Sequence, residues 1–330
     1  MAETRIGISG WTYAPWRGVF YPKDVTIKRE LAYAATKFNS IEINGSFYSL
    51  QRPSSYQMWY EATPQDFIFA IKGGRFITHM KKLRDVEEAT ANFFASGLLA
   101  LKEKLGPILW QFPAAFAFNP LRFESFFELL PKDTHEAAKL ARKHNDKVKG
   151  RAYTKAHVDQ AVRHAVEIRH PSFLCDEFIE LLRRYNIALV FADTAGIWPY
   201  AEDVTADFVY LRLHGAEQLY ASGYTDAMLD WWASRIRMWR KGQAPCDTRC
   251  CSSLRPPKMR ARDVYCYFDN DAKVHAPFDA MRLAARLRGG RKSPDAHGRA
   301  PHGAGEEPRE TWPDYGTRSR RGLKTRATGS

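Results

Sequence analysis

The stretch that decides the fold is Phe208-Val209-Tyr210-Leu211-Arg212-Leu213-His214. Its aliphatic side chains fall on one face, and its tyrosine, arginine and histidine fall on the other. Strict alternation with a period of two predicts a β-strand. A strand that carries charge on one face beside a fully aliphatic face needs a chemical reason for that charge, because buried charges are costly.

Similar short β-rich runs recur along the 330 residues. The seven further predicted strands are Arg5–Gly10, Ser40–Asn44, Phe67–Lys72, Ile108–Phe112, Ala165–Arg169, Ala188–Asp193 and Val264–Asp269. Helical periodicity predicts helices over 28–38, 55–61, 85–104, 121–130, 172–185, 225–240 and 276–288. Strands that alternate with helices indicate a parallel sheet. Eight of them predict a single (β/α)₈ TIM barrel, a fold that takes about 250 residues.

The remaining segments interrupt or extend this barrel. We assign residues 1–288 to the barrel and residues 289–330 to a disordered basic tail, because the tail is rich in Gly, Pro and Arg without periodicity. Gly242–Arg262 is a Pro-containing insertion before the eighth strand. The charged stretch His135–Lys155 is interpreted as an elaborated loop near the barrel mouth.

The net charge of +13 is concentrated in these extensions. Residues 240–262 hold seven basic residues against the single acid Asp247, and residues 289–330 hold nine basic residues against five acids. A solvated basic tail is the simpler interpretation, and a nucleic-acid-binding arm is the alternative. No apolar run approaches the roughly 20 residues of a membrane span, and the opening residues show no export signal. We therefore expect a cytoplasmic protein.

Five cysteines fit reduced thiols in such a compartment. Cys246, Cys250 and Cys251 lie close together in the insertion but lack a second pair or a histidine at zinc-finger spacing. We predict no cofactor. A divalent metal at the strand ends remains an alternative, although the Lys and Arg residues there would repel it.

Polar residues occupy the interior phase at the C-terminal end of strand after strand, where barrel enzymes hold their active sites. Beside Arg212 and His214 these are Ser9, Glu42 and Asn44, Lys72, Gln111, Glu167 and Arg169, Asp193, and Asp269 with Asn270 and Asp271 just beyond. Internal salt bridges that close the barrel top are one explanation. Because such bridges stabilise a protein poorly compared with apolar packing, we favour a functional site.

The residue types suggest roles. Lys72, Arg169 and Arg212 are suited to hold an anionic ligand. His214 is the best candidate for proton transfer, with Glu167, Glu42 and Asp193 as candidate general acids or bases. His79 and His170 follow the third and fifth strands as further candidates for binding. The aromatic residues Trp11, Tyr13 and Tyr48 follow the first two strands and would either stack on a sugar or base or pack the lid.

These residues resemble the signature of the YecE-like family, domain of unknown function 72. The matching motifs are Gly7-Ile8-Ser9-Gly10-Trp11-Thr12-Tyr13, Glu42-Ile43-Asn44, Ser46-Phe47-Tyr48, Ile77-Thr78-His79, Gln111-Phe112-Pro113, Glu167-Ile168-Arg169-His170, Tyr210-Leu211-Arg212-Leu213-His214-Gly215 and Tyr267-Phe268-Asp269-Asn270-Asp271. The resemblance covers about residues 5–288. It implies a barrel fold and supplies no established reaction.

Three functions stay open on this basis. The first is a hydrolase-like enzyme that acts on a small anionic or sugar-phosphate substrate at the barrel mouth. The second is a metal-dependent enzyme that processes nucleic acid, by analogy with other barrels. The third is a binding protein without catalytic activity, which senses a metabolite or docks on nucleic acid through its basic extensions.

Overall fold

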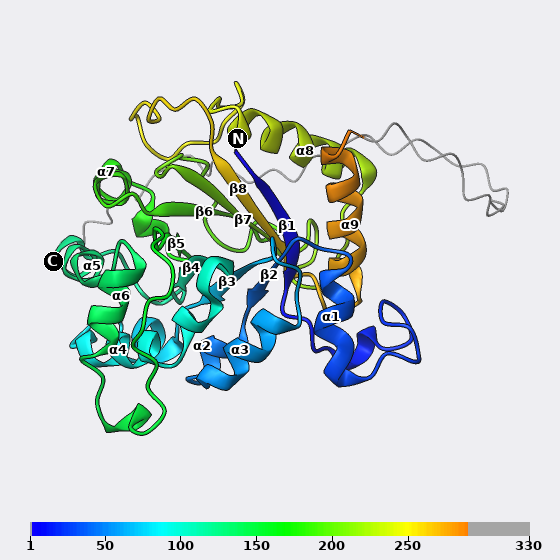
Figure 1. Cartoon of the computed structure of the whole chain (residues 1–330). Helices are drawn as coiled ribbons and strands as arrows, with labels where there is room; N and C mark the ends of the chain where they lie inside the picture. The colour runs from blue at the N-terminus through cyan, green and yellow to red at the C-terminus, as the bar shows by residue number, and fades with distance from the viewer. Residues whose placement is uncertain (1, 290–330) are drawn as a thin grey trace, which may run out of the picture.

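The computed structural model describes residues 2–289, and these form a closed barrel of parallel strands in the order β1 to β8 (Figure 1). The strands are β1 (Thr4–Ser9), β2 (Ser40–Ile43), β3 (Ile68–Lys72), β4 (Leu105–Gln111), β5 (His164–Glu167), β6 (Ala188–Asp193), β7 (Phe208–Leu213) and β8 (Asp263–Phe268). β8 pairs with β1 and so closes the sheet. The predicted TIM barrel and its eight strands are confirmed.

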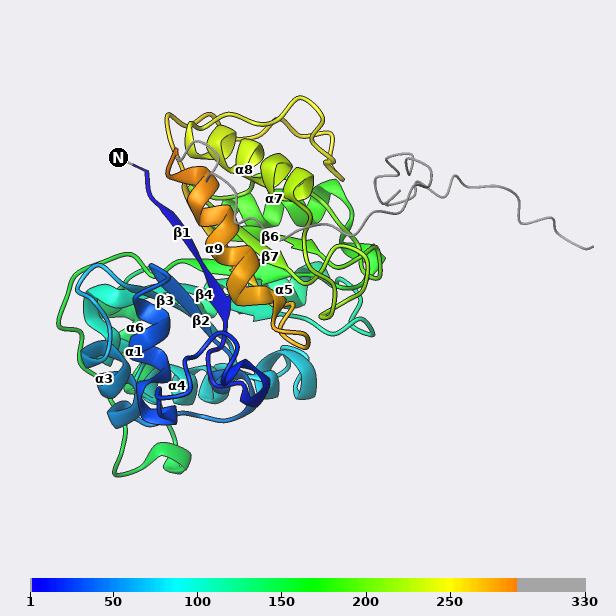
Figure 2. The ribbon, with the colours of Figure 1, turned by 90° about the vertical axis from the view of Figure 1, so that its right-hand side faces the viewer.

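Helices surround this barrel. They are α1 (Glu30–Ala35), α2 (Gly45–Tyr48), α3 (Pro53–Glu61), α4 (Glu87–Ala95), α5 (Pro120–Leu129), α6 (Thr134–Ala141), α7 (Asp176–Arg184), α8 (Asp226–Arg240) and α9 (His275–Leu287). Short 3₁₀ turns are η1 (Ala14–Trp16), η2 (Ile27–Arg29), η4 (Leu98–Lys104), η5 (Asp146–Val148) and η6 (Pro171–Phe173), and η3 (Phe76–Met80) is a π-helical turn. Figure 2 shows α9 lying along β1, which it contacts.

Two secondary-structure predictions were wrong, one for a helix and one for a loop. The single helix expected over 85–104 is broken into α4 and η4 at Gly97, whose φ is +124°. A Cβ there would lie 2.6 Å from Pro53 Cα and 2.9 Å from the Tyr56 ring, so only glycine fits this close approach. The loop expected over His135–Lys155 in fact contains most of α6. Asp133 accepts a hydrogen bond from Glu136 N and caps that helix.

Apolar packing forms two layers. The outer layer lies between barrel and helices and includes the outward residues Ile41, Val166 and Leu211. The inner layer fills the barrel with residues such as Leu109 and Tyr210. The inward and outward phases predicted for these strands are therefore confirmed, and the interior is packed rather than hollow.

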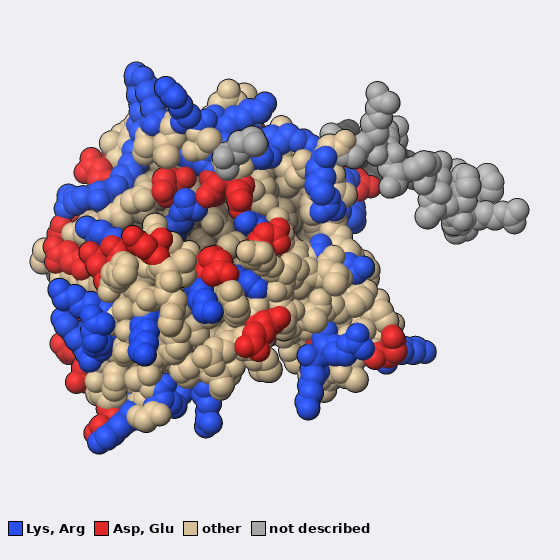
Figure 3. Space-filling view, in the orientation of Figure 1, with Lys and Arg blue, Asp and Glu red and all other residues tan. Residues whose placement is uncertain are grey.

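The two ends of the barrel differ. Strands begin at the end where the N-terminus lies, and the insertion 242–262 follows α8 back to that same end (Figures 1 and 2). Lys and Arg side chains gather over this part of the molecule in Figure 3. The insertion forms neither helix nor strand and leads directly into β8. The predicted tail over 289–330 lies, apart from Gly289, outside the described residues.

No helix within residues 2–289 combines the length and the apolar composition that a membrane crossing needs.

Candidate functional site

A buried network of charges crosses the barrel at the C-terminal ends of the strands, with Arg212 at its centre. The guanidinium binds Glu42 through two nitrogens, with Nε 3.1 Å from Oε2 and Nη2 2.9 Å from Oε1. It also donates to Glu167 Oε2 at 2.7 Å, Asp269 Oδ2 at 2.8 Å and Ser9 Oγ at 3.1 Å. Arg212, Glu42 and Glu167 have side chains that are 0% exposed.

Each carboxylate in this network has further partners. Glu42 accepts hydrogen bonds from Ser9 Oγ and, at 2.6 Å, from the Tyr210 hydroxyl. Burial by itself would raise the pKa of Glu167 and of Asp269, but Arg212 and His214, with Arg169 beside Glu167 and Lys72 near Asp269, together outweigh it and lower both pKa values. Glu167 and Asp269 therefore stay ionised beside the guanidinium.

His214 lies against this network without a strong hydrogen bond to it. Its Nδ1 is 3.0 Å from Asp269 Oδ2, but the direction of the ring nitrogen does not meet that oxygen in a hydrogen bond. Its Nε2 is 3.3 Å from Arg212 Nη1 and 3.8 Å from Glu167 Oε2. His214 is completely buried, and so are Glu42 and Glu167, the carboxylates predicted to move protons with it.

A cavity of about 560 Å³ opens beside this network at the same end of the barrel. Its walls are Phe47, Tyr48, Lys72, Arg75, His79, Met80, Gln111, Arg169 and Tyr220. Lys72 is the last residue of β3, Gln111 is the last residue of β4, and Arg169 follows β5. The wall thus carries one lysine, two arginines and a histidine but no Asp or Glu.

Lys72 is the most buried cation of this wall, with 9% of the residue exposed. Its Nζ lies 4.5 Å from the centre of the Phe47 ring, and it forms no ion pair within the described residues. Burial and, next, the charge of Arg212 lower the pKa of Lys72 to about 8. His79 meets the same Phe47 ring edge-on at 5.1 Å. Burial and the charge of Lys72 lower the pKa of His79 to about 4, so it is neutral at pH 7.

Arg169 is held in place from three sides. Its Nε donates to Glu167 Oε1 at 2.9 Å, its Nη2 donates to the Tyr220 hydroxyl at 3.3 Å, and its guanidinium lies 3.6 Å from the centre of the Trp198 ring. Nη1 has no hydrogen-bond partner in the described part of the chain. The fixed guanidinium therefore keeps one donor nitrogen available at the cavity.

The structure brings most of the predicted site residues into these two groups. Ser9, Glu42, Glu167, Arg212 and His214 belong to the network, and Tyr48, Lys72, His79, Gln111 and Arg169 line the cavity. Asn44 donates to Ser9 Oγ at 3.0 Å. Tyr13 donates to the Ser9 carbonyl at 2.6 Å and contacts Asp271, which raises the pKa of Tyr13 in addition to the larger effect of burial.

Four predicted residues lie apart. Trp11 packs edge-on against Trp59 of α3, and His170 Nδ1 accepts from Ser172 N and so caps η6. Asp193 accepts from the Tyr224 hydroxyl at 3.0 Å. The fourth, Asn270, donates to Asp279 and to a backbone carbonyl.

The cavity also contains residues that the sequence did not indicate, namely Arg75, Met80 and Tyr220. All three lie beyond strand ends, in segments whose approach to the mouth depends on the tertiary fold. Residues 2–289 contain no group of three or more His, Cys, Asp and Glu side chains placed to hold a metal ion. The same residues contain no disulfide, and all five cysteines are free.

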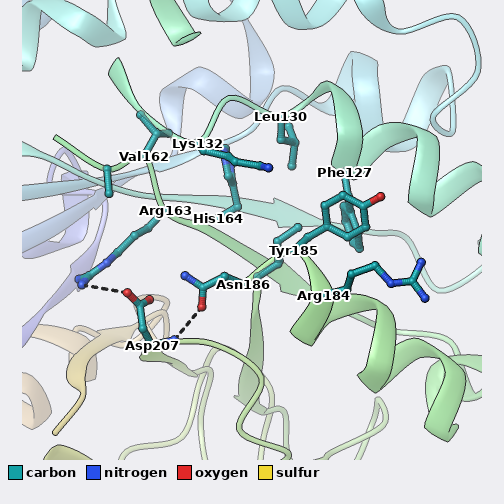
Figure 4. Close-up of a pocket in the computed structure, with 12 residues that line it drawn as sticks. Phe127, Leu130, Lys132, Val162, Arg163, His164, Arg184, Tyr185, Asn186 and Asp207 are labelled. Atoms are coloured by element: carbon teal, nitrogen blue, oxygen red, sulfur yellow. Dashed lines mark hydrogen bonds and ion pairs between the residues drawn. The ribbon is translucent and has the colours of Figure 1, made fainter. Parts of the chain in front are cut away.

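A second, smaller cavity of about 270 Å³ lies at the opposite end of the barrel (Figure 4). Its wall includes Lys132 and Arg163. Arg163 pairs with Asp207 at 3.7 Å and with Asp263 at 2.7 Å. Arg163 is therefore neutralised by protein carboxylates, unlike Lys72. Burial lowers the pKa of His164 to about 4.

Comparison with known proteins places this chain in a family. The family model described as "Protein of unknown function DUF72" matches residues 5–303. The chain is 27% identical over 116 residues to the UPF0759 protein YunF of Bacillus subtilis and 29% identical over 111 residues to the UPF0759 protein YecE of Escherichia coli. Each match covers 34% of this chain, and the chain spans only 40% and 38% of those two proteins.

Solved structures share the fold over a longer range. A DUF72 family protein from Thermotoga maritima superposes with a TM-score of 0.65 at 24% identity, over 87% of this chain and 99% of that one. A second, from Enterococcus faecalis, gives 0.62 at 16% identity, over 89% and 100%. Because the family model covers most of the sequence and the fold agrees, the chain belongs to the DUF72 family.

Proposed function

We propose that this protein binds a small organic anion, with a phosphate or carboxylate group, in the cavity at the C-terminal mouth of the barrel. The observation that carries the proposal is the charge of the cavity wall. Lys72, Arg75 and Arg169 line it, and no acidic residue does. A volume of about 560 Å³ suits a small molecule, since ligand cavities commonly measure about 300–1,000 Å³.

The desolvated ammonium of Lys72 supports this assignment. A buried cation without an ion-pair partner is costly, and its lowered pKa expresses that cost. A bound anion would compensate the charge and return the pKa towards its ordinary value. Arg169 adds a fixed guanidinium, which is suited to the oxygens of a phosphate or carboxylate.

Gln111 supports the assignment independently. The residue is only 4% exposed and lines the cavity, yet its side-chain amide forms no hydrogen bond with any residue that the structure describes. The amide opens into the cavity and is not among the enclosed unpartnered polar groups, so it is available to a ligand or to water. Its NH₂ group could donate to an anion's oxygen.

The predicted hydrolase reaction is not part of this proposal. His214, Glu167 and Glu42 belong to the buried network and do not line the cavity. We assign Arg212 a positioning role, because its nitrogens are engaged by protein carboxylates. A hydrolase mechanism that uses these residues stays a prediction.

Isothermal titration calorimetry tests the proposal. Inorganic phosphate, pyrophosphate, citrate and 3-phosphoglycerate would be titrated into wild-type protein and into Lys72→Met and Arg169→Gln variants. Loss of one charge-assisted hydrogen bond costs about 1.5–3 kcal/mol, so each variant should bind about 10- to 100-fold more weakly. Lys132→Met, in the wall of the opposite cavity, is the matched control and should bind like wild type. Equal affinities for wild type and both mouth variants would refute the proposal.

A further inference from the structure

We propose that Lys72 is a nucleophile that forms an imine with an aldehyde or ketone substrate carrying a phosphate or carboxylate group. This inference rests on the proposed function, because the anionic group would be held in the same cavity. It adds the reactive part of the substrate and the covalent step that one residue performs.

The first support is that the Lys72 amine is free of protein partners. Lys72 and Lys104 are the two buried lysines of residues 2–289, but their surroundings differ. Lys104 Nζ donates to Tyr60 O at 2.5 Å, to Thr63 O at 2.8 Å and to Thr63 Oγ1 at 3.2 Å. These bonds occupy the donor directions of the Lys104 ammonium, which leaves it no free side for a ligand. Lys72 Nζ forms no hydrogen bond or ion pair with the described residues and lies over the Phe47 ring, although Asp269, Glu167 and Glu42 act on its charge at longer range.

The second support is position. Lys72 ends β3 and opens into the cavity, whose wall also includes the guanidinium groups of Arg75 and Arg169. A substrate bound through its anionic end by a guanidinium would therefore have its carbonyl group inside the same small volume as the amine. Confinement of two reactants in this way supplies much of the acceleration of an intramolecular reaction.

The third support is the protonation state. Only a neutral amine has the lone pair needed for attack, and burial beside cations favours the neutral form. The pKa of Lys72 is lowered to about 8, so roughly half of the amines are neutral at pH 8, whereas an ordinary lysine is almost entirely charged there. The neutral fraction arises from the same surroundings that leave the amine without partners.

The step balances without a further reactant. The amine nitrogen attacks the carbonyl carbon, a C–N bond forms, and one proton passes from nitrogen to the carbonyl oxygen to give a carbinolamine. The C–O bond then breaks, water leaves, and the imine remains. His79 lines the cavity, but its pKa of about 4 makes it a weak base, so the proton passes to the carbonyl oxygen directly or through solvent. No atom is oxidised or reduced.

Reductive trapping tests this inference. The full chain would be incubated with pyruvate, glyoxylate or dihydroxyacetone phosphate together with sodium cyanoborohydride, and the adduct would be located by intact mass and peptide mapping. We expect an adduct at Lys72 that forms about tenfold or more faster than at exposed lysines such as Lys132. Adduct formation should be slowed by inorganic phosphate and should rise with pH through about 8.

Two variants separate this inference from the proposed function. Lys72→Arg lacks the nucleophile and should lose the adduct, with its folding checked by circular dichroism. Lys104→Met removes the other buried lysine, which lies outside the cavity wall, and should keep both the adduct and phosphate binding. If wild type binds phosphate but none of the three carbonyl compounds labels Lys72 faster than Lys132, the imine is refuted and anion binding stands. If none of inorganic phosphate, pyrophosphate, citrate and 3-phosphoglycerate binds, the proposed function fails as well.

Discussion

Replacing Arg212 with methionine removes the guanidinium that Glu42, Glu167 and Asp269 share. These carboxylates are buried, and each lies within 3.1 Å of a guanidinium nitrogen. Removing one partner of a single buried ion pair typically costs about 3–5 kcal/mol. Because three acids lose their cation here, we expect at least that loss in the free energy of unfolding at pH 7.

The loss should depend on pH in a definite direction. In the wild type the pKa values of Glu167 and Asp269 are depressed, so their stabilising contribution is present above about pH 4 and disappears as the pH falls through the folded-state values. Without Arg212, burial dominates and raises these pKa values. Between pH 7 and pH 4 the folded variant then takes up protons that the unfolded chain does not. The difference in unfolding free energy between wild type and variant therefore becomes smaller as the pH falls.

Urea unfolding followed by tryptophan fluorescence measures this effect at pH 7 and pH 4.5. Arg286→Gln is the matched control, because Arg286 pairs with the exposed carboxylates of Asp226 and Asp230 and should cost less than about 1 kcal/mol. If Arg212→Met does not fold, Arg212→Lys retains the charge and should show an intermediate loss. The reasoning would be refuted if the Arg212 and Arg286 variants lost equal free energy of unfolding at pH 7. It would also be refuted if the difference between wild type and the Arg212 variant were larger at pH 4.5 than at pH 7.

Three further predictions concern the cavity and the tail. Phosphate binding at pH 8.5 should take up protons through Lys72, so the heat should vary with the buffer's ionisation enthalpy in wild type and lose that variation in Lys72→Met. Gln111→Leu should weaken phosphate binding severalfold in calorimetry without lowering stability in urea, because no protein hydrogen bond is lost. Truncation after Arg288 should leave phosphate affinity unchanged. If the tail binds nucleic acid, the truncation should also abolish salt-sensitive binding in a fluorescence-polarisation assay.

The barrel was predictable because its signal is local. Alternation within each strand fixes which side chains point inward, and Glu42, Glu167 and Arg212 meet inside the barrel for that reason. The break at Gly97 was not predictable, because it depends on a close approach of Pro53 in another element. The helix α6 had a readable signal, since Asp133 and Glu136 form a capping pair at its start.

The sequence predicted only part of the membership of the candidate site, and it did not predict the division into a buried network and a cavity wall. The inward phase identifies Lys72 and Arg212 equally, yet one lines the cavity and the other is enclosed by acids. Lys72 is 9% exposed and Arg212 is 0% exposed, and the alternation of side chains along a strand does not encode this difference. Arg75 and Tyr220 could not be found from periodicity, because they lie in loops that only the folded chain brings to the mouth.

The guanidinium of Arg212 connects side chains from β1, β2, β5 and its own β7, together with Asp269 directly after β8. The ends of these strands therefore cannot spread apart independently of one another. Among the strands at the cavity this fixes β5, whose Glu167 also binds Arg169. The Arg169 guanidinium is therefore held in one place, and we expect it to lose little conformational entropy if an anion binds there.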